Sequence, residues 1–169
     1  MGFGKEVPLA GFAGWEFAAG SPASTGGAVT MSSGAHGHWI SEVITKVAVL
    51  RPDGEIETRE LARMNFGYRQ SSIRTGDIVI AAELLLPRGD LQVIRDLRAQ
   101  CLDYRKQTQP LTLPSAGSIF RNPSRETALP SNLQRLNIAL QNGGSYAAAE
   151  LLEICGMKNQ TSGAIQFSG

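Results

Sequence analysis

The chain has few of the residues from which metal sites and disulfide frameworks are built. It holds two cysteines and two histidines among 169 residues. Cys101 and Cys155 stand far apart and neither has a Cys-x-x-Cys partner, so we expect free thiols in a reducing compartment. His36 and His38 flank Gly37 without a nearby cluster of aspartate or cysteine. We therefore expect no metal site.

Charge and hydropathy exclude two further classes of protein. The formal net charge is only +1, which gives no basic surface for nucleic acid. The longest apolar run is far too short to span a bilayer, and the first residues lack the apolar core of a signal peptide. We expect neither a nucleic-acid nor a membrane partner. The hydrophobic fraction of 42% over this length is typical of one globular domain, or of one and a half.

Glycine, in contrast, is abundant, and it concentrates in residues 20–37. There the hydroxyl residues Ser24 and Thr25 precede Gly26 and Gly27. Backbone N–H groups in such a run can surround phosphate oxygens, above all where a helix begins. Neither a Walker loop nor a Gly-x-Gly-x-x-Gly fingerprint is present. A flexible linker is the alternative, but the apolar residues within the run favour tight packing against a ligand or another backbone.

A second stretch, Phe66–Ser71, places Tyr68 beside Arg69. The planar guanidinium of arginine binds a carboxylate or a phosphate through two parallel hydrogen bonds. The alternative is an ordinary surface arginine.

A third stretch, Leu113–Pro123, carries Ser118 just before the apolar pair Ile119–Phe120. We expect this pair to anchor the segment in a core. Arg121 and Asn122 follow at once, so the Ser118 hydroxyl would be held beside a cation and an amide. Such a hydroxyl suits a proton donor that faces an anionic substrate. The alternative is a serine that caps a turn.

The pattern of the remaining residues predicts an α+β fold. β-Branched residues predict a strand over 42–50, and a turn at Pro52–Gly54 leads to a returning strand over 55–58. A longer apolar strand is expected over 77–86. Prolines predict a boundary near 107–114. We expect a mixed or antiparallel sheet with flanking helices, followed by part of a small α+β substrate domain.

A helix is predicted to begin after Asp90, whose side chain is a good N-cap. Apolar residues recur at helical spacing along it, while Arg98 is expected to face solvent. The residues expected to face inward are Ile94, Leu97, Cys101 and Tyr104.

The three stretches, in this order, resemble the UDP-N-acetylenolpyruvoylglucosamine reductase (UDP-N-acetylmuramate dehydrogenase) family. Its motifs are G-x-P-G-x-x-G-G-A-x-x-M-N-x-G-A-Y-G, G-Y-R-x-S and P-S-A-G-S-x-F-K/R-N-P. The resemblance runs from about Gly11 to Gln166. The chain departs from the first motif at Ala23, Ser32 and His36, where the family has glycine, asparagine and tyrosine.

The resemblance implies a division into domains. Residues 1–108 would form the second, flavin- and substrate-facing domain, incomplete at its start, and residues 109–169 part of the C-terminal substrate-binding domain. In the family an FAD-binding domain comes first, and a glutamate near the end completes the catalytic set. We therefore expect a fragment that binds FAD weakly or not at all unless this domain is supplied in cis or in trans.

The resemblance also implies an activity, the FAD-dependent, NADPH-using reduction of UDP-N-acetylglucosamine enolpyruvate to UDP-N-acetylmuramate. This reaction belongs to peptidoglycan precursor synthesis in the cytoplasm, or to the plastid stroma in a plant. Ser118 would donate the proton, Arg69 would hold the substrate carboxylate, and Tyr68 would line the pocket. Arg121 and Asn122 would contact substrate. The implied cofactor-binding residues are Ser24, Thr25, Gly26, Gly27, Gly34, Ala35 and Gly37.

Two other interpretations stay open. One is a non-catalytic relative that only binds a nucleotide-sugar or a partner. The other is a different FAD-linked oxidoreductase. The presence of Ser118 together with Arg69 favours the reductase over the second of these.

Overall fold

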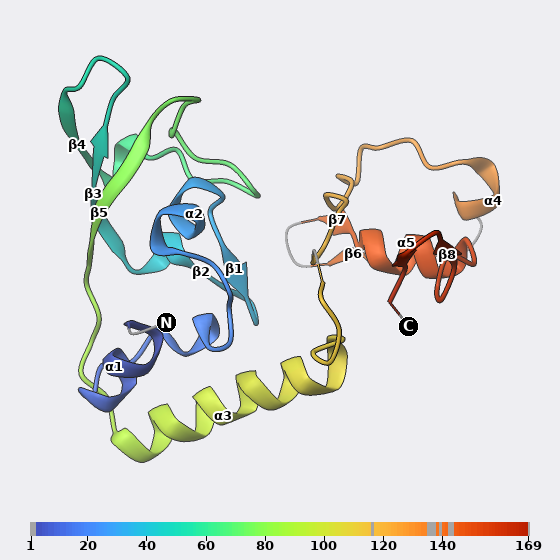
Figure 1. Ribbon diagram of the computed structural model, residues 1–169, viewed down its shortest axis with the longest axis horizontal. Helices are drawn as coiled ribbons and strands as arrows, with labels where there is room; N and C mark the ends of the chain where they lie inside the picture. The colour runs from blue at the N-terminus through green and yellow to red at the C-terminus, as the bar shows by residue number, and fades with distance from the viewer. Residues whose placement is uncertain (1–2, 116, 135–137, 139, 142–143, 169) are drawn as a thin grey trace. The chain divides into compact units, whose positions relative to one another are not determined.

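A computed structural model describes residues 3–115, 117–134, 138, 140–141 and 144–168 (Figure 1). The chain divides into two compact units, Met1–Gln107 and Thr108–Gly169. Within the described residues, no helix is both long and apolar enough to cross a membrane.

The first unit is built around a three-stranded antiparallel sheet. Its order is β4-β3-β5, with β3 in the centre. The strands of the sheet are β3 (Ile44–Leu50), β4 (Ile56–Glu60) and β5 (Ile78–Leu84). A small hairpin, β1 (Gly34–Ala35) with β2 (His38–Trp39), stands apart from the sheet. The α-helices are α1 (Phe3–Leu9), α2 (Thr25–Thr30) and α3 (Leu91–Thr108), and the 3-10 helices are Glu16–Ala18, Ile40–Glu42 and Leu61–Arg63.

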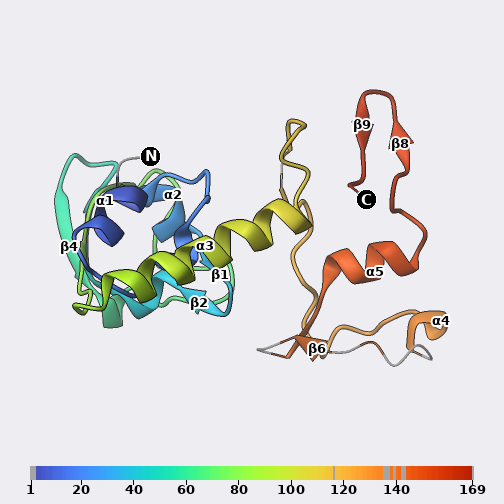
Figure 2. The same ribbon diagram turned by 90° about the horizontal axis from the view of Figure 1, so that it is seen from below.

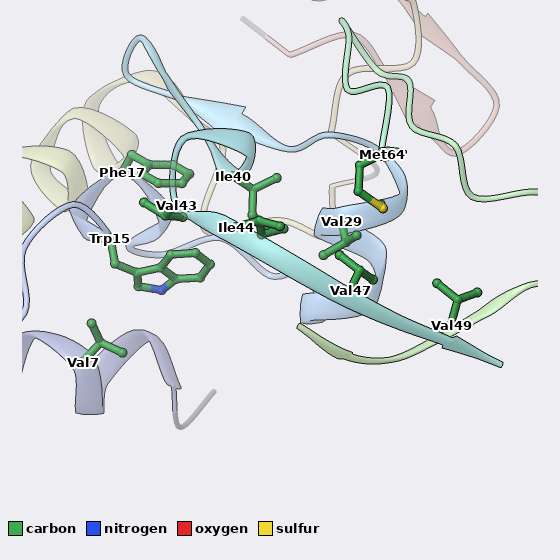
Figure 3. Close-up of a cluster of buried hydrophobic side chains, with 10 residues drawn as sticks. All are labelled: Val7, Trp15, Phe17, Val29, Ile40, Val43, Ile44, Val47, Val49 and Met64. Atoms are coloured by element: carbon green, nitrogen blue, oxygen red, sulfur yellow. The ribbon is translucent and has the colours of Figure 1, made fainter. Parts of the chain in front are cut away.

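The core of the first unit lies on one face of β3, as the close-up in Figure 3 shows. Val47 and Val49 of β3 are fully buried there, and Val29 of α2 packs against the same face together with Met64. Trp15 and other residues of the N-terminal segment complete the cluster. The expected α+β fold with an antiparallel sheet is therefore confirmed.

Two helix starts are capped by side chains, and the cap expected at Asp90 is confirmed. The Ser24 Oγ accepts a hydrogen bond from the Gly27 N–H at 3.1 Å, which caps α2. The Asp90 carboxylate accepts from the N–H groups of Gln92 and Val93 at 2.8 and 3.0 Å, which caps α3. Both caps satisfy backbone donors that have no partner inside the helix.

The inward face of α3 differs from the predicted one. In both views α3 runs along one side of the first unit (Figures 1 and 2). Ile94 is buried as expected, but Leu97 and Tyr104 are exposed. Leu102 and Arg105 approach Gly20 instead, since a Cβ on that glycine would lie 3.0 and 3.1 Å from their side chains. Cys101 is half-buried, so the prediction was wrong only at Leu97 and Tyr104, because the methylene stem of Arg105 packs inward while Leu97 stays outside.

Among its described residues, the second unit contains short elements. They are α4 (Ser131–Gln134), β6 (Leu140–Gln141), β7 (Ser145–Tyr146), α5 (Ala148–Ile154), β8 (Thr161–Ser162) and β9 (Ile165–Gln166). β6 pairs antiparallel with β7, and β8 pairs antiparallel with β9 in a hairpin that Figure 2 shows. Leu133 and Ala148 are its buried apolar residues among those described.

The core of the first unit gives a direct test of the fold. Ile44 of β3 is 2% exposed, whereas Ile56 of β4 is 64% exposed. We expect Ile44→Ala to lower the free energy of unfolding by about 2–5 kcal/mol, because it leaves a cavity. The matched control Ile56→Ala should change it by no more than about 0.5 kcal/mol. Urea unfolding followed by tryptophan fluorescence reports on this unit alone, because Trp15 and Trp39 both lie in it.

Candidate functional site

The glycine-rich stretch forms the start of α2. Ser24, Thr25 and Gly27 are exposed there. The first N–H groups of a helix have no partner within it, so this turn presents donors to solvent. Gly26 lies at the opposite side of the turn, because a Cβ on it would stand 3.5 Å from the Val79 carbonyl oxygen of β5. The close packing of backbone on backbone that the sequence suggested is therefore present here.

The β1–β2 hairpin continues the stretch. His36 and Gly37 form its turn, both with positive φ, at 54° and 80°. Gly34 is required by packing, since a Cβ on it would lie 2.5 Å from the Trp39 ring. The His36 ring contacts the Tyr104 ring edge-on at 5.3 Å between centroids. Burial, helped by the Arg105 charge, lowers the pKa of His36, so this ring is held neutral more readily than an exposed one.

Ser32 is one of the positions at which the chain departs from the family motif, and its backbone conformation is unusual. It is buried and has a φ of 44°, just after α2. Asparagine adopts this left-handed conformation more readily than serine does. The backbone conformation at Ser32 therefore favours the asparagine that the family has at this position.

Tyr68 and Arg69 occupy the tip of a tight turn. Gly67 and Gln70 close this turn by exchanging backbone hydrogen bonds of 3.0 and 3.1 Å. Arg69 has a φ of 54°, a conformation that glycine or asparagine usually supplies in such a turn. Its guanidinium carbon lies 5.8 Å from the centroid of the Tyr68 ring. Within the described part of the chain, no carboxylate pairs with Arg69.

Ser71 connects this turn to the glycine-rich stretch. Its Oγ donates to the Thr30 carbonyl oxygen at the end of α2, at 2.7 Å, and accepts from the Ile73 N–H at 3.3 Å. Ser71 and Thr30 are 41 positions apart in the chain. Two of the three stretches singled out by sequence are therefore joined in the structure by a direct hydrogen bond.

A buried arginine that the sequence did not single out stands beneath the same loop. Arg59 of β4 is 7% exposed. Its guanidinium donates to Glu57 Oε2 at 2.9 Å, to Asp77 Oδ2 at 3.2 Å and to the Ser72 carbonyl oxygen at 3.0 Å. Arg59 lies one residue beyond the strand expected over 55–58, and it shares a face of β4 with Glu57, two positions before it.

The ion pairs of Arg59 shift the acid–base behaviour of their partners. The hydrogen bond from Arg59 lowers the pKa of Glu57. The pKa of Asp77 is lowered first by the N–H of Arg74 and then by Arg59. Both carboxylates therefore stay ionised to lower pH in the folded chain than they would in an unfolded one.

The third stretch lies in the second unit and differs from expectation. Gly117 has a φ of 71°, and its N–H donates to Ser115 Oγ at 3.1 Å. Ser118 is exposed. Ile119 and Phe120 are 68% and 54% exposed, so the expectation that they anchor the segment in a core was wrong. Ala116 lies outside the described residues.

The segment is held instead by backbone pairing further along. The Tyr146 N–H donates to the Pro123 carbonyl oxygen and the Arg125 N–H to that of Gly144, each at 2.9 Å. Asn122 Oδ1 accepts from the Ala148 N–H at 3.0 Å and so satisfies a donor in the first turn of α5. This structural contact of Asn122, formed over 26 positions, could not be predicted from local sequence.

The structure thus groups the expected residues into two sets. Ser24 to Gly37 and the Tyr68–Arg69 turn lie together in the first unit. Ser118, Arg121 and Asn122 follow one another in the second. Arg121 is exposed.

Comparisons with known proteins point to one class, reductases that act on a nucleotide-sugar. Residues 109–169 match the family described as UDP-N-acetylenolpyruvoylglucosamine reductase, C-terminal domain. The chain is 40% identical over 159 residues to the UDP-N-acetylenolpyruvoylglucosamine reductase of Halalkalibacterium halodurans, with 94% of this chain and 46% of that protein covered. It is 49% identical over 121 residues to the reductase of the same name from Bacillus pumilus, covering 70% of this chain and 40% of that protein.

The fold agrees with these matches. The crystal structure of UDP-N-acetylenolpyruvylglucosamine reductase from Thermus caldophilus superimposes with a TM-score of 0.77 and 27% identity, over 98% of this chain and 53% of that one. The chain is thus related in sequence and fold to UDP-N-acetylenolpyruvoylglucosamine reductase, and the resemblance inferred from its motifs is confirmed. It spans about half the length of the curated relatives it matches, 46% for the first of them.

The lowered pKa values predict how stability depends on pH. Because the folded-state pKa of Asp77 lies below its unfolded value, the hydrogen bond from the Arg74 N–H and the ion pair with Arg59 stabilise the fold above about pH 4, and this contribution is lost as the pH falls further. Asp77→Asn should therefore lower the urea midpoint at pH 7, and its deficit relative to wild type should shrink as the pH falls below the unfolded-state pKa of about 4. The control Asp53→Asn, at an exposed carboxylate, should show a much smaller deficit at pH 7. A deficit for Asp77→Asn that is constant with pH would contradict this account.

Proposed function

We propose that this chain forms the substrate-facing part of an FAD-dependent reductase that converts UDP-N-acetylglucosamine enolpyruvate to UDP-N-acetylmuramate, with NADPH as the hydride donor. The observation that carries the proposal is Arg69, which forms no ion pair with a carboxylate among the described residues and stands at the tip of a turn, within a chain related to that reductase. In this proposal residues 1–108 are the flavin- and substrate-facing domain and 109–169 are part of the substrate-binding domain.

The described residues are compatible with a flavin nucleotide. The first turn of α2 is exposed, and its backbone donors suit an anionic group. A bound FAD would supply the hydride chemistry, taking a hydride from NADPH and giving it to the enolpyruvyl double bond. Gly34 fits this scheme less directly, because its lack of a side chain is already accounted for by Trp39. The residues proposed to contact the cofactor are Ser24, Thr25, Gly26, Gly27, Gly34, Ala35 and Gly37.

Arg69 is proposed to hold the carboxylate of the enolpyruvyl group. Hydride addition leaves negative charge that the carboxylate shares, and a fixed guanidinium stabilises that charge as it develops. Tyr68, half-exposed beside Arg69, is proposed to line the same pocket. The turn closed by the Gly67–Gln70 backbone hydrogen bonds presents both side chains from adjacent positions.

Ser118 is proposed to deliver the proton that completes the reduction. The proton on its Oγ would pass to the carbanion-like carbon, and a proton from solvent would then restore the hydroxyl. Exposure of Ser118 leaves it accessible to a substrate, and a neighbouring cation such as Arg121 would ease loss of the proton. Asn122 is proposed to contact substrate as well, although its Oδ1 already accepts from Ala148.

A chimera tests the proposal. This chain replaces the matching 159-residue region of the Halalkalibacterium halodurans reductase, and turnover of the enolpyruvyl substrate with NADPH is measured. We expect the chimera to oxidise NADPH in a manner that depends on the substrate. A folded, flavin-loaded chimera that consumes NADPH without forming UDP-N-acetylmuramate would refute the assignment.

In that chimera Arg69→Lys should lower kcat/KM by about tenfold to a thousandfold, the range for losing one preorganised donor. Lysine keeps the charge but cannot form the two parallel hydrogen bonds of a guanidinium. Arg95→Lys, at an exposed position of α3, serves as the control and should leave the kinetics unchanged. Near-normal kinetics for Arg69→Lys would remove its carboxylate role.

Ser118→Ala should act on one half-reaction only. Reduction of the flavin by NADPH should proceed almost normally, while its reoxidation by the enolpyruvyl substrate should slow by about a hundredfold to ten thousandfold. Stopped-flow absorbance separates the two steps. Ser118→Cys should retain more activity, since a thiol can still donate a proton. Equal slowing of both steps, or none, would mean that Ser118 only shapes its loop.

A further inference from the structure

The loop that carries Arg69 is attached to the sheet by one buried side chain. Met64 to Asp77 connects the 3-10 helix after β4 to β5, and Tyr68–Arg69 is its tip. Within this loop the Ser72 N–H donates to the Met64 carbonyl oxygen at 2.6 Å. The Ser72 carbonyl oxygen accepts from Arg59 Nη1 at 3.0 Å. Arg59 therefore holds the part of the loop that returns from the turn.

The same guanidinium also fixes the far end of the loop. Arg59 Nη2 donates to Asp77 Oδ2 at 3.2 Å, and that oxygen also accepts from the Arg74 N–H at 3.1 Å. The side chains of Arg59 and Asp77 are 8% and 4% exposed. Glu57 Oε2 accepts from both Nε and Nη2 of Arg59, at 3.1 and 2.9 Å, and thereby fixes the plane of the guanidinium. Through its three nitrogens, the planar guanidinium of Arg59 thus bonds to Glu57 of β4 and, in the loop, to Ser72 and Asp77.

Such an attachment is needed because the turn is in a costly conformation. A non-glycine residue with positive φ is stable only where the surroundings fix it, and Arg69 has a φ of 54°. The Gly67–Gln70 pair closes the turn locally, and Ser71 ties it to Thr30. We propose that Arg59 is a positioning residue that maintains the strained Tyr68–Arg69 turn, so that the Arg69 guanidinium is presented to a carboxylate ligand. The part of this inference that concerns the ligand rests on the proposed function.

Hydrogen exchange of the full chain tests the positioning role without any ligand. Arg59→Met keeps an apolar stem and removes the three sets of hydrogen bonds. We expect the Gln70 and Ser72 amides to exchange about tenfold to a hundredfold faster, the range for losing a hydrogen bond to a charged group. The amides of Val47 and Val49 in the core strand should keep their rates. Unchanged rates at Gln70 and Ser72, or equal acceleration at the core strand, would overturn the inference.

The chain offers a matched control. Arg51 pairs with the same Glu57 carboxylate, at 3.7 Å, but it is largely exposed. Within the described part of the chain, Arg51 forms no hydrogen bond with Ser72 or Asp77, so Arg51→Met should leave exchange at Gln70 and Ser72 unchanged. If Arg59→Met does not fold, Asp77→Asn weakens the same attachment, and it should accelerate exchange at Ser72 more than at Val47. Equal acceleration at both amides would again overturn the inference.

A second measurement joins the inference to function. Titration calorimetry of the full chain with UDP-N-acetylenolpyruvoylglucosamine should show weaker affinity for Arg59→Met and for Arg69→Lys, and unchanged affinity for Arg51→Met. In the Arg69→Lys background, Arg59→Met should have little further effect, because it acts through Arg69. Fully additive effects would contradict a positioning role. Tight binding that is insensitive to Arg69→Lys would refute the proposed function of Arg69, while the exchange measurement would still decide the role of Arg59.

Discussion

The apolar cluster that buries Val29 of α2 together with Val47 of β3 is the feature on which the first unit depends. Both side chains are fully buried in this cluster (Figure 3), and α2 packs against the sheet at β5, where Gly26 meets Val79. A helix of six residues with two glycines has little stability of its own, so tertiary packing and the Ser24 cap must hold it. Because Ser71 bonds to the last residue of α2, the same packing also determines where the Tyr68–Arg69 turn stands.

Much of the frame could be predicted from sequence because its causes are local. The caps Ser24 and Asp90 and the strands around 44–50 and 78–84 follow from residue type and period alone. The prediction that Leu97 and Tyr104 face inward on α3 was wrong, because the stem of an arginine, Arg105, covers apolar surface there. The spacing of hydrophobic residues alone does not take such arginine stems into account. The burial expected for Ile119 and Phe120 was also wrong. Two adjacent apolar residues are buried only where other elements pack against them, and local sequence does not show this.

The candidate site was less predictable because its support is long-range. The motifs located the turn at Tyr68–Arg69, but nothing local indicated the bond from Ser71 to Thr30 or the contacts of Arg59. A buried arginine in a strand resembles an ordinary surface charge until its partners are known. Asn122 shows the converse, since a residue singled out for substrate also satisfies a helix N–H far along the chain.

Arg69 and Ser118 should therefore respond differently to substitutions elsewhere in the chain, because different contacts hold them. Arg69 is fixed by side-chain and backbone contacts that reach α2, β4 and the start of β5, so substitutions remote from the ligand can displace it. Ser118 is held mainly by backbone pairing that begins at Pro123, several residues downstream. A carboxylate clamp requires fixed geometry, because charge stabilisation falls when the donor must reorganise. A proton donor requires only brief approach to the carbon, so looser support is compatible with its proposed task.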